Sequence, residues 1–183
     1  YMALLFLDIR NFTPLAEKHE PGRVIHMIQK LFSSFQRIIR VYHGRVIETT
    51  GDGLYAAFDI GDTSARSVES AVAAGRAIFT ALGAMNAETT GEQIQVGIGV
   101  HAGKVATGNI RIHSRTHHIV MGHAVNVASR IQAATKELNN DFIVSRDVYE
   151  LLPQGNAKAT RRRTRLKGLS EEYELCLIGN PYY

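Results

Sequence analysis

Two aspartates stand at the ends of apolar segments that have the character of strands. Asp8 lies in FLDIRNFT (6–13), and Asp52 lies in GDGLYAAF (51–58). A carboxylate at the end of a buried strand raises the free energy of the folded state unless a partner neutralises it or forms hydrogen bonds with it. Two converging carboxylates suit hard divalent cations, which prefer oxygen ligands. Two cations held in this way can clamp the oxygens of a phosphoryl group during an in-line displacement. Because strands often end in an aspartate that only caps the next turn, neither residue identifies such a site by itself.

The segments around the two aspartates predict how they are presented. Residues 10–13 follow Asp8 where a helix is expected to begin, so successive backbone N–H groups there can face an anion. This would be a phosphate cradle without the glycine-rich loop of a Walker motif. In the second segment Gly51 and Gly53 permit a tight hairpin turn, with Asp52 at its tip pointing back toward Asp8.

A third segment, MGHAVNVASRI (121–131), carries an amide and a guanidinium at helical spacing. Asn126 and Arg130 are four residues apart, so both project from one face of the predicted helix. Such a pair is usually only part of a solvated surface. Here, however, a predicted strand and a glycine come directly before the helix. The start of a helix in such a position faces a ligand-binding site.

Hydrophobic periodicity predicts the elements that position these residues. It indicates strands over 3–9, 93–101, 104–110, 117–121, 142–145, 160–167 and 172–178, a hairpin over 44–58, helices from 13 and over 22–42, 63–85 and 123–137, and a short helix after 145. Helices and strands alternate irregularly, which predicts an α+β fold with a mixed, largely antiparallel sheet flanked by helices. We expect residues 1–183 to form a single domain, because no repeat or convincing linker divides them.

Composition supports one domain with a substantial core, since 45% of the 183 residues are hydrophobic. We find no segment that is long and apolar enough to span a membrane, and expect no membrane contact from this segment. Residues 1–9 already have strand character without a signal-peptide pattern, so we expect a domain cut from a longer protein. The single cysteine, Cys176, is predicted to be a core residue in a reducing, cytoplasmic compartment.

The net charge is +4, and residues 158–167 (KATRRRTRLK) are strongly basic. This run is either a solvated strand and turn or an anion site. It is one short stretch without interleaved aromatic residues, which argues against nucleic acid as a partner. A polyanionic small ligand fits better.

In their order and spacing the motifs resemble the class III nucleotidyl cyclases, that is, the adenylate and guanylate cyclase catalytic domain. The resemblance covers residues 3–178 through FLDIRNFT, GDGLYAAF, GIGVHAGKVATGN, HAVNVASR and RLKGLSEEYELCLI. No single motif would suffice, but five in the family's order are specific. The resemblance implies a ferredoxin-like α/β sandwich that converts a nucleoside triphosphate into its 3′,5′-cyclic monophosphate and pyrophosphate.

The resemblance also implies metal and phosphate ligands. Asp8 and Asp52, helped by the carbonyl of Ile9, would bind two Mg²⁺ or Mn²⁺ ions. Lys167 would bind the terminal phosphates. The backbone of four residues would hold the β- and γ-phosphates, namely Arg10, Asn11, Phe12 and Thr13.

Two helix residues complete the implied machinery. Asn126 would orient the ribose, and Arg130 would stabilise charge on the α-phosphate as the 3′-oxygen attacks and pyrophosphate leaves. The family forms its sites between two catalytic domains, with the metal aspartates from one and the asparagine and arginine from the other. Because this chain carries both halves, the resemblance implies a head-to-tail homodimer with two composite active sites.

The residues at two positions do not decide which base the substrate carries. Adenylate cyclases usually have a lysine four residues before the second metal aspartate, and an aspartate or threonine seven before the ribose-orienting asparagine; here these are Glu48 and Ile119. Guanylate cyclases carry a glutamate at the first position, and guanine offers it two adjacent donors. Ile119 cannot hydrogen-bond to any base, so UTP, CTP and ATP remain alternatives to GTP. Glu48 would have no role in base selection if it only pairs with Arg45 or Lys104.

Two other functions compete with an active cyclase. A catalytically degenerate module would bind nucleotide and signal by dimerisation, but it has no need of the intact transition-state residue Arg130. A palm-type polymerase or diguanylate cyclase shares the two-metal chemistry. Its GG(D/E)EF turn is matched only in part by ETTGDGLY (48–55), and HAVNVASR (123–130) has no role in it.

Four histidines gather around a predicted strand and helix start: His113, His117, His118 and His123. Clustered histidines can bind a metal. Alternation along a strand, however, places His117 and His118 on opposite faces, and phosphate chemistry prefers oxygen ligands. We therefore interpret these histidines as surface residues or residues of the family's dimer arm.

Overall fold

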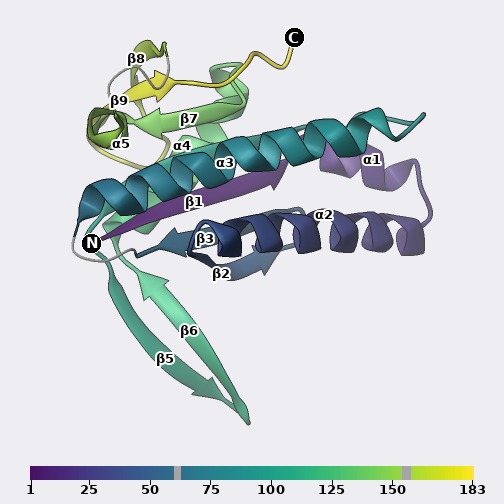
Figure 1. Cartoon of the computed structure of the whole chain (residues 1–183), viewed down its shortest axis with the longest axis horizontal. Coiled ribbons are helices and arrows are strands. Elements are labelled where there is room, and N and C mark those ends of the chain that lie inside the picture. Colours follow the sequence, from purple (N-terminus) through teal and green to yellow (C-terminus); the bar gives the residue numbers. More distant parts are fainter. Residues whose placement is uncertain (60–62, 154–157) are drawn as a thin grey trace.

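A mixed sheet forms the centre of the structure, a computed structural model that describes residues 1–59, 63–153 and 158–183 (Figure 1). Its strands are β1 (Met2–Ile9), β2 (Gly44–Thr50), β3 (Gly53–Phe58), β4 (Val96–Gly103), β7 (Phe142–Ser145), β8 (Thr160–Arg165) and β9 (Glu172–Leu177). Their order is β2-β3-β1-β4-β7-β9-β8, and all neighbouring pairs are antiparallel except β4 and β7. The helices are α1 (Phe12–Glu17), α2 (Pro21–Val41), α3 (Ser64–Ala87), α4 (His123–Glu137) and α5 (Arg146–Leu151). The predicted α+β fold is confirmed.

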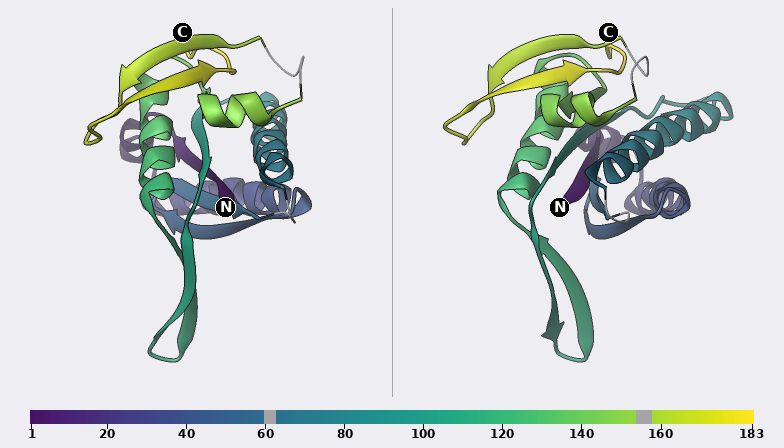
Figure 2. Two further views of the ribbon diagram at one scale, coloured as in Figure 1. Left: turned by 90° about the vertical axis from the view of Figure 1, so that its left-hand side faces the viewer. Right: turned by 60° about the vertical axis from the view of Figure 1, so that its left-hand side comes forward.

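The central strand β1 separates two layers of side chains. Its odd-numbered residues from Ala3 to Ile9 are buried in the main core together with residues of α2 and α3. Leu4 faces the other way, into a smaller cluster that includes Ala124 and Ala128 of α4. Figure 2 shows α4 on one side of β1 and β4 and α3 on the other. By alternation along the strand, Asp8 belongs to the same face as Leu4 and α4.

The close packing of α4 on β4 explains the segment GIGVHAG (97–103). Val96, Ile98 and Val100 point into the main core, whereas the glycines between them lie under α4. A Cβ atom added to Gly99 would lie only 2.3 Å from the backbone nitrogen of Gln132, which no side chain can tolerate. The glycines therefore fix the depth of α4 on the sheet and the orientation of its outer face.

Strand β4 begins later than periodicity predicts. The side-chain amide of Asn86 donates to the carbonyl of Ile94 at 2.8 Å and accepts from its backbone nitrogen at 2.9 Å. These two bonds hold residues 88–95 as a loop after α3, so the strand starts at Val96 and not near residue 93. The correction arises from a side chain that competes with strand pairing.

A long hairpin projects from the body of the molecule (Figure 2). It consists of β5 (Ala106–Ile112) and β6 (Arg115–Met121), whereas the sequence predicted strands over 104–110 and 117–121. Ile110, Ile112 and Met121 are 45%, 51% and 61% exposed on this hairpin. The hairpin thus presents apolar side chains that find no cover within the chain.

Helix α3 departs from one expectation. Among the described residues it is the one helix that is long and apolar enough, by length and composition, to cross a membrane, whereas the sequence analysis found no such segment. Val68, Ala71 and Ile78 of this helix are fully buried in the main core. A core helix meets the same criterion, so the match is weak evidence for a membrane span. Cys176 is fully buried in β9, as predicted.

Candidate active site

Asp8 and Asp52 meet at one end of the central strands. Asp8 pairs with Gly53 across β1 and β3, and the backbone amide of Ile9 donates to the carbonyl of Asp52 at 2.9 Å. Burial, followed by the charge of the nearby Asp52, raises the pKa of Asp8 to about 6. The hairpin tip therefore points back toward Asp8, as the sequence indicates.

The carboxylate of Asp8 has the character of a cation ligand. Its Oδ1 atom is buried and finds no hydrogen-bond partner in the part of the chain that the structure describes. An unsatisfied carboxylate oxygen beside a second carboxylate is unfavourable unless a cation or a proton neutralises it. The residues present thus fit a divalent metal ion, and the Ile9 backbone lies beside them for the predicted carbonyl ligand.

The segment after Asp8 only partly matches the predicted cradle. Helix α1 begins at Phe12, and Asn11 precedes it in the left-handed region at φ 51, which asparagine tolerates. The backbone N–H of Arg10 donates to the carbonyl of Gln95 at 2.7 Å. This bond corrects one expectation, because it occupies the Arg10 amide that was expected to face an anion. Any anion contact at this position has to come from the Arg10 side chain.

Asn126 and Arg130 share the exposed face of α4, as predicted. The opposite face packs Val127 and Ile131 against β7 and β9. The Nη2 atom of Arg130 would lie 3.9 Å from a Cβ on Gly168, which places this guanidinium beside the turn that carries Lys167. The structure therefore places the Arg130 side chain beside the distant segment of the sequence that carries Lys167.

The predicted residues thus form two half-sites in one chain. The aspartates lie at the β1–β3 end, and the cationic half-site lies on the outer face of α4 and the turn at Lys167. Within residues 1–59, 63–153 and 158–183, no hydrogen bond or ion pair joins one half-site to the other.

The two positions that were predicted to select the base, Glu48 and Ile119, are connected by a tyrosine that was not predicted as a site residue. A β-bulge at Ile47 places Glu48 directly opposite Tyr55, and after burial the charge of Glu48 is the second factor that raises the pKa of Tyr55. The Tyr55 hydroxyl donates to the carbonyl of Val120, the neighbour of Ile119, at 3.0 Å. Glu48 and Ile119 therefore flank one tyrosine, although they come from β2 and β6. The bulge that creates this arrangement has no clear sequence signal.

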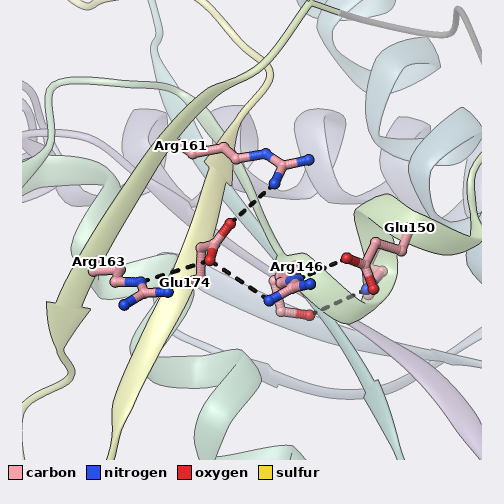
Figure 3. A network of polar contacts seen from close by, with 7 residues as sticks. Arg146, Glu150, Arg161, Arg163 and Glu174 are labelled. Carbon is pink, nitrogen blue, oxygen red and sulfur yellow. Dashed lines mark hydrogen bonds and ion pairs between the residues drawn. The ribbon is translucent and has the colours of Figure 1, made fainter.

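The basic run forms the edge strand β8 and is partly neutralised. Arg161 and Arg163 lie 3.3 and 3.7 Å from the carboxylate of Glu174, which Arg146 also approaches at 3.8 Å (Figure 3). This arrangement supports the interpretation of a solvated strand for these arginines. Lys167 lies beyond the strand and is exposed.

The four histidines either contact polar neighbours or lie exposed. His118 Nδ1 contacts Asn109 Oδ1 at 3.0 Å, and His123 Nε2 contacts the Tyr173 hydroxyl at 3.0 Å. In the part of the chain that the structure describes, no group of three acidic, histidine or cysteine side chains could hold a metal ion. His113 and His117 are exposed on the projecting hairpin, which fits their interpretation as surface residues.

The fold and the two half-sites define an α+β domain with a carboxylate pair on one side and an asparagine, an arginine and a lysine on the other. The chain belongs to the adenylate and guanylate cyclase catalytic domain family, whose model matches residues 1–179. It is 31% identical over 176 residues to an adenylate cyclase of Anabaena cylindrica, covering 93% of this chain and 35% of that protein. Adenylate cyclase 1 of Rhizobium meliloti is 27% identical over 172 residues, covering 88% of this chain and 26% of that protein.

The structure is also similar to the crystal structure of the guanylyl cyclase Cya2. The TM-score is 0.85 at 26% identity, covering 99% of this chain and 94% of that chain. The present chain spans only about a quarter to a third of the length of the two curated relatives.

Proposed function

We propose that this domain converts a nucleoside triphosphate into its 3′,5′-cyclic monophosphate and pyrophosphate. The observation that carries the proposal is the buried Oδ1 of Asp8 beside Asp52, which has no hydrogen-bond partner among the described residues, in a chain that also places Arg130 beside Gly168, the neighbour of Lys167. A binding module has no need of a second, cationic half-site directed at the reacting phosphate. Family membership agrees with this activity.

In the proposed mechanism the metal half-site is formed by Asp8, Asp52 and the carbonyl of Ile9. Two Mg²⁺ or Mn²⁺ ions bound there would lower the pKa of the 3′-hydroxyl and would neutralise negative charge on the leaving pyrophosphate. The backbone of residues 11–13 and the side chain of Lys167 bind the β- and γ-phosphates.

The helix residues act on the ribose and the α-phosphate. Asn126 orients the ribose so that its 3′-oxygen is in line with the bond to be broken, and Arg130 donates to the α-phosphate oxygens as their charge grows. Such preorganised donors are favoured because they stabilise the transition state more than the ground state.

We also propose that two copies form a head-to-tail homodimer with two composite active sites. Two observations on the described residues support it: no hydrogen bond or ion pair joins the two half-sites, and Ile110, Ile112 and Met121 of the β5–β6 hairpin are exposed. In the dimer, the aspartates of one copy face the α4 residues of the other. A cytoplasmic location accompanies this proposal, because nucleoside triphosphates are cytoplasmic substrates and the single buried cysteine needs no oxidising compartment.

For the base we propose GTP, with UTP or CTP next and ATP last. Glu48 is exposed on β2, and Tyr55 lies opposite it on the same face, so its carboxylate is available to the adjacent N1–H and N2 donors of guanine. Adenine offers one donor beside the N1 acceptor, which the carboxylate repels. The apolar Ile119 adds no adenine-specific hydrogen bond.

Purified protein incubated with Mn²⁺ and each of the four ribonucleoside triphosphates tests activity and base together. Mass spectrometry of the products is expected to show a cyclic monophosphate and pyrophosphate, with GTP giving the most. Cyclic product from ATP alone would overturn the base assignment. No cyclic product from any of the four would overturn the enzymatic function and favour the degenerate binding module.

A further inference from the structure

The end of the chain packs a tyrosine against the metal half-site. The ring of Tyr182 lies 4.5 Å from the guanidinium carbon of Arg10, in cation–π geometry. Its hydroxyl donates to the carbonyl of Val96 at 3.3 Å. Both partners come from segments that border Asp8, since Arg10 follows it and Val96 pairs with Ile9.

Three further hydrogen bonds anchor this C-terminal segment. Asn139, just after α4, accepts from the Tyr182 backbone nitrogen at 2.9 Å and donates to the Tyr183 carbonyl at 3.0 Å. Gln95 donates to the Tyr182 carbonyl at 3.5 Å. Because these bonds hold the backbone on both sides of the ring, the position of Tyr182 is determined by the fold.

The sheet leaves room for this ring next to Asp8. Gly97 is the partner of Asp8 across β1 and β4, and a Cβ added to it would lie 2.7 Å from the Tyr182 hydroxyl. A side chain at this position would therefore exclude the ring. The same Cβ would also meet the Thr135 hydroxyl of α4, so the space that Gly97 leaves is shared by Thr135 and Tyr182.

Arg10 itself is incompletely satisfied. Its Nε atom is buried and has no hydrogen-bond partner among the described residues, and the residue lines a cavity of about 370 Å³ together with Asn11, Lys18 and Glu92. The charge of Arg10 opposes the rise in the pKa of Asp8, so the guanidinium lies within electrostatic reach of that carboxylate. A guanidinium with an unused buried donor at this place is suited to a phosphate oxygen.

We propose that Tyr182 is a positioning residue that holds the Arg10 side chain at the edge of the metal half-site, where Arg10 binds the polyphosphate end of the substrate. The inference rests on the proposed function for the identity of the ligand. It concerns a residue beyond the matched family region, which ends at residue 179. Tyr182 acts only through Arg10, because the ring removes alternative positions of a long and flexible side chain.

Binding of inorganic tripolyphosphate with Mn²⁺, measured by isothermal titration calorimetry, tests the inference without depending on base or turnover. Tyr182→Leu is expected to weaken binding about tenfold, as the loss of a partly desolvated cation–π contact predicts. Tyr182→Phe keeps the ring and is expected to bind within about twofold of wild type. Tyr183→Leu is the matched control, because that side chain is 90% exposed.

A double-mutant cycle separates positioning from general destabilisation. Arg10→Met is expected to weaken binding at least as much as Tyr182→Leu, and the double variant no more than Arg10→Met alone, because Tyr182 acts only through Arg10. In the cyclase assay Tyr182→Leu is expected to raise KM more than it lowers kcat. Wild-type binding by Tyr182→Leu, or fully additive losses, would overturn the inference. If wild type binds Mn²⁺ and tripolyphosphate but yields no cyclic product, the proposed function fails while the role of Tyr182 is still decided by the binding data.

Discussion

The amide of Ile9 donates to the carbonyl of Asp52 at 2.9 Å, so the end of β1 and the tip of the β2–β3 hairpin are held together through their backbones. The two carboxylates on either side of this bond are therefore brought together by main-chain geometry. Replacing either carboxylate should leave this bond, and hence the fold, intact.

Asp52→Ala is accordingly expected to abolish metal-dependent cyclisation while the melting temperature changes little. The hairpin tip carries little packing, and loss of the second negative charge relieves repulsion at Asp8. A cyclase assay beside a thermal melt checks both parts. Asp59→Ala, an exposed position just after the other end of β3, is the control and should keep full activity. Turnover by Asp52→Ala would refute the metal assignment.

Without metal, the free energies of unfolding of wild type and Asp8→Asn should differ increasingly as the pH rises. The pKa of Asp8 rises from 3.8 to about 6 on folding, first through burial and then through Asp52. Above that pKa the charged carboxylate costs the folded state free energy; as pH falls toward about 4 the cost disappears. In EDTA the variant is expected to be more stable by about 1–3 kcal/mol near pH 8, and equal to wild type near pH 4. Urea unfolding at both pH values measures this; a difference independent of pH would contradict it.

Composite active sites predict complementation between inactive chains. Asp52→Ala damages one half-site and Arg130→Ala the other, so a mixed dimer keeps one intact site out of two. Coexpression in equal amounts should restore about a quarter of wild-type activity, because half of the dimers are mixed. Each variant alone gives the background rate. No recovery, with dimers confirmed by light scattering, would show that both half-sites act within one chain.

Base preference should change when the two positions beside Tyr55 are exchanged together. Glu48→Lys with Ile119→Asp places a donor and an acceptor where adenine can use them, so the ratio of kcat/KM for ATP to that for GTP is expected to rise at least about tenfold. Competition between the two triphosphates measures the ratio. Lys30→Glu, a charge change at an exposed position of α2, serves as the control. An unchanged ratio in the double variant would mean that Glu48 and Ile119 do not face the base.

A buried histidine makes the domain sensitive to acid. His101 is 8% exposed under α4, and its Nδ1 lies 2.8 Å from the Ser145 hydroxyl. Burial lowers its pKa from 6.5 to about 4, with Asp147 opposing and His123 reinforcing this change. The neutral ring is therefore favoured by folding, and stability is lost as pH falls from about 6.5 toward 4. Between about pH 7.5 and pH 5 wild type should lose about 2 kcal/mol more than His101→Gln, as measured by urea unfolding. Equal losses would contradict this.

Much of the site could be predicted because its chemistry lies in short segments. Asp8 follows an uninterrupted apolar strand, and Asn126 and Arg130 are one helical turn apart, so local periodicity was enough to orient them. The late start of β4 could not be predicted in the same way. Strand propensity does not show that the Asn86 side chain will form hydrogen bonds with the backbone of Ile94 in place of a neighbouring strand.

The contacts that the sequence did not reveal are all made between distant segments. Tyr182 meets Arg10 across almost the whole chain, and Tyr55 joins Glu48 to Val120 only because a bulge shifts the register of β2. Neither tyrosine stands out in composition or spacing. Likewise, the pairing of His101 with Ser145 depends on the parallel contact between β4 and β7, which no local pattern encodes.

Strand β8 ends the sheet, and its outer edge has no neighbouring strand among the described residues. Unpaired edges invite strands of other molecules, and consecutive arginines are an effective deterrent because stacking them against a second copy brings like charges together. Arg161 and Arg163 share one carboxylate, Glu174, so the edge remains cationic at neutral pH. The same arginines that make the run look like a ligand site thus protect the domain from aggregation, and replacing them with threonine would be expected to lower its solubility before its activity.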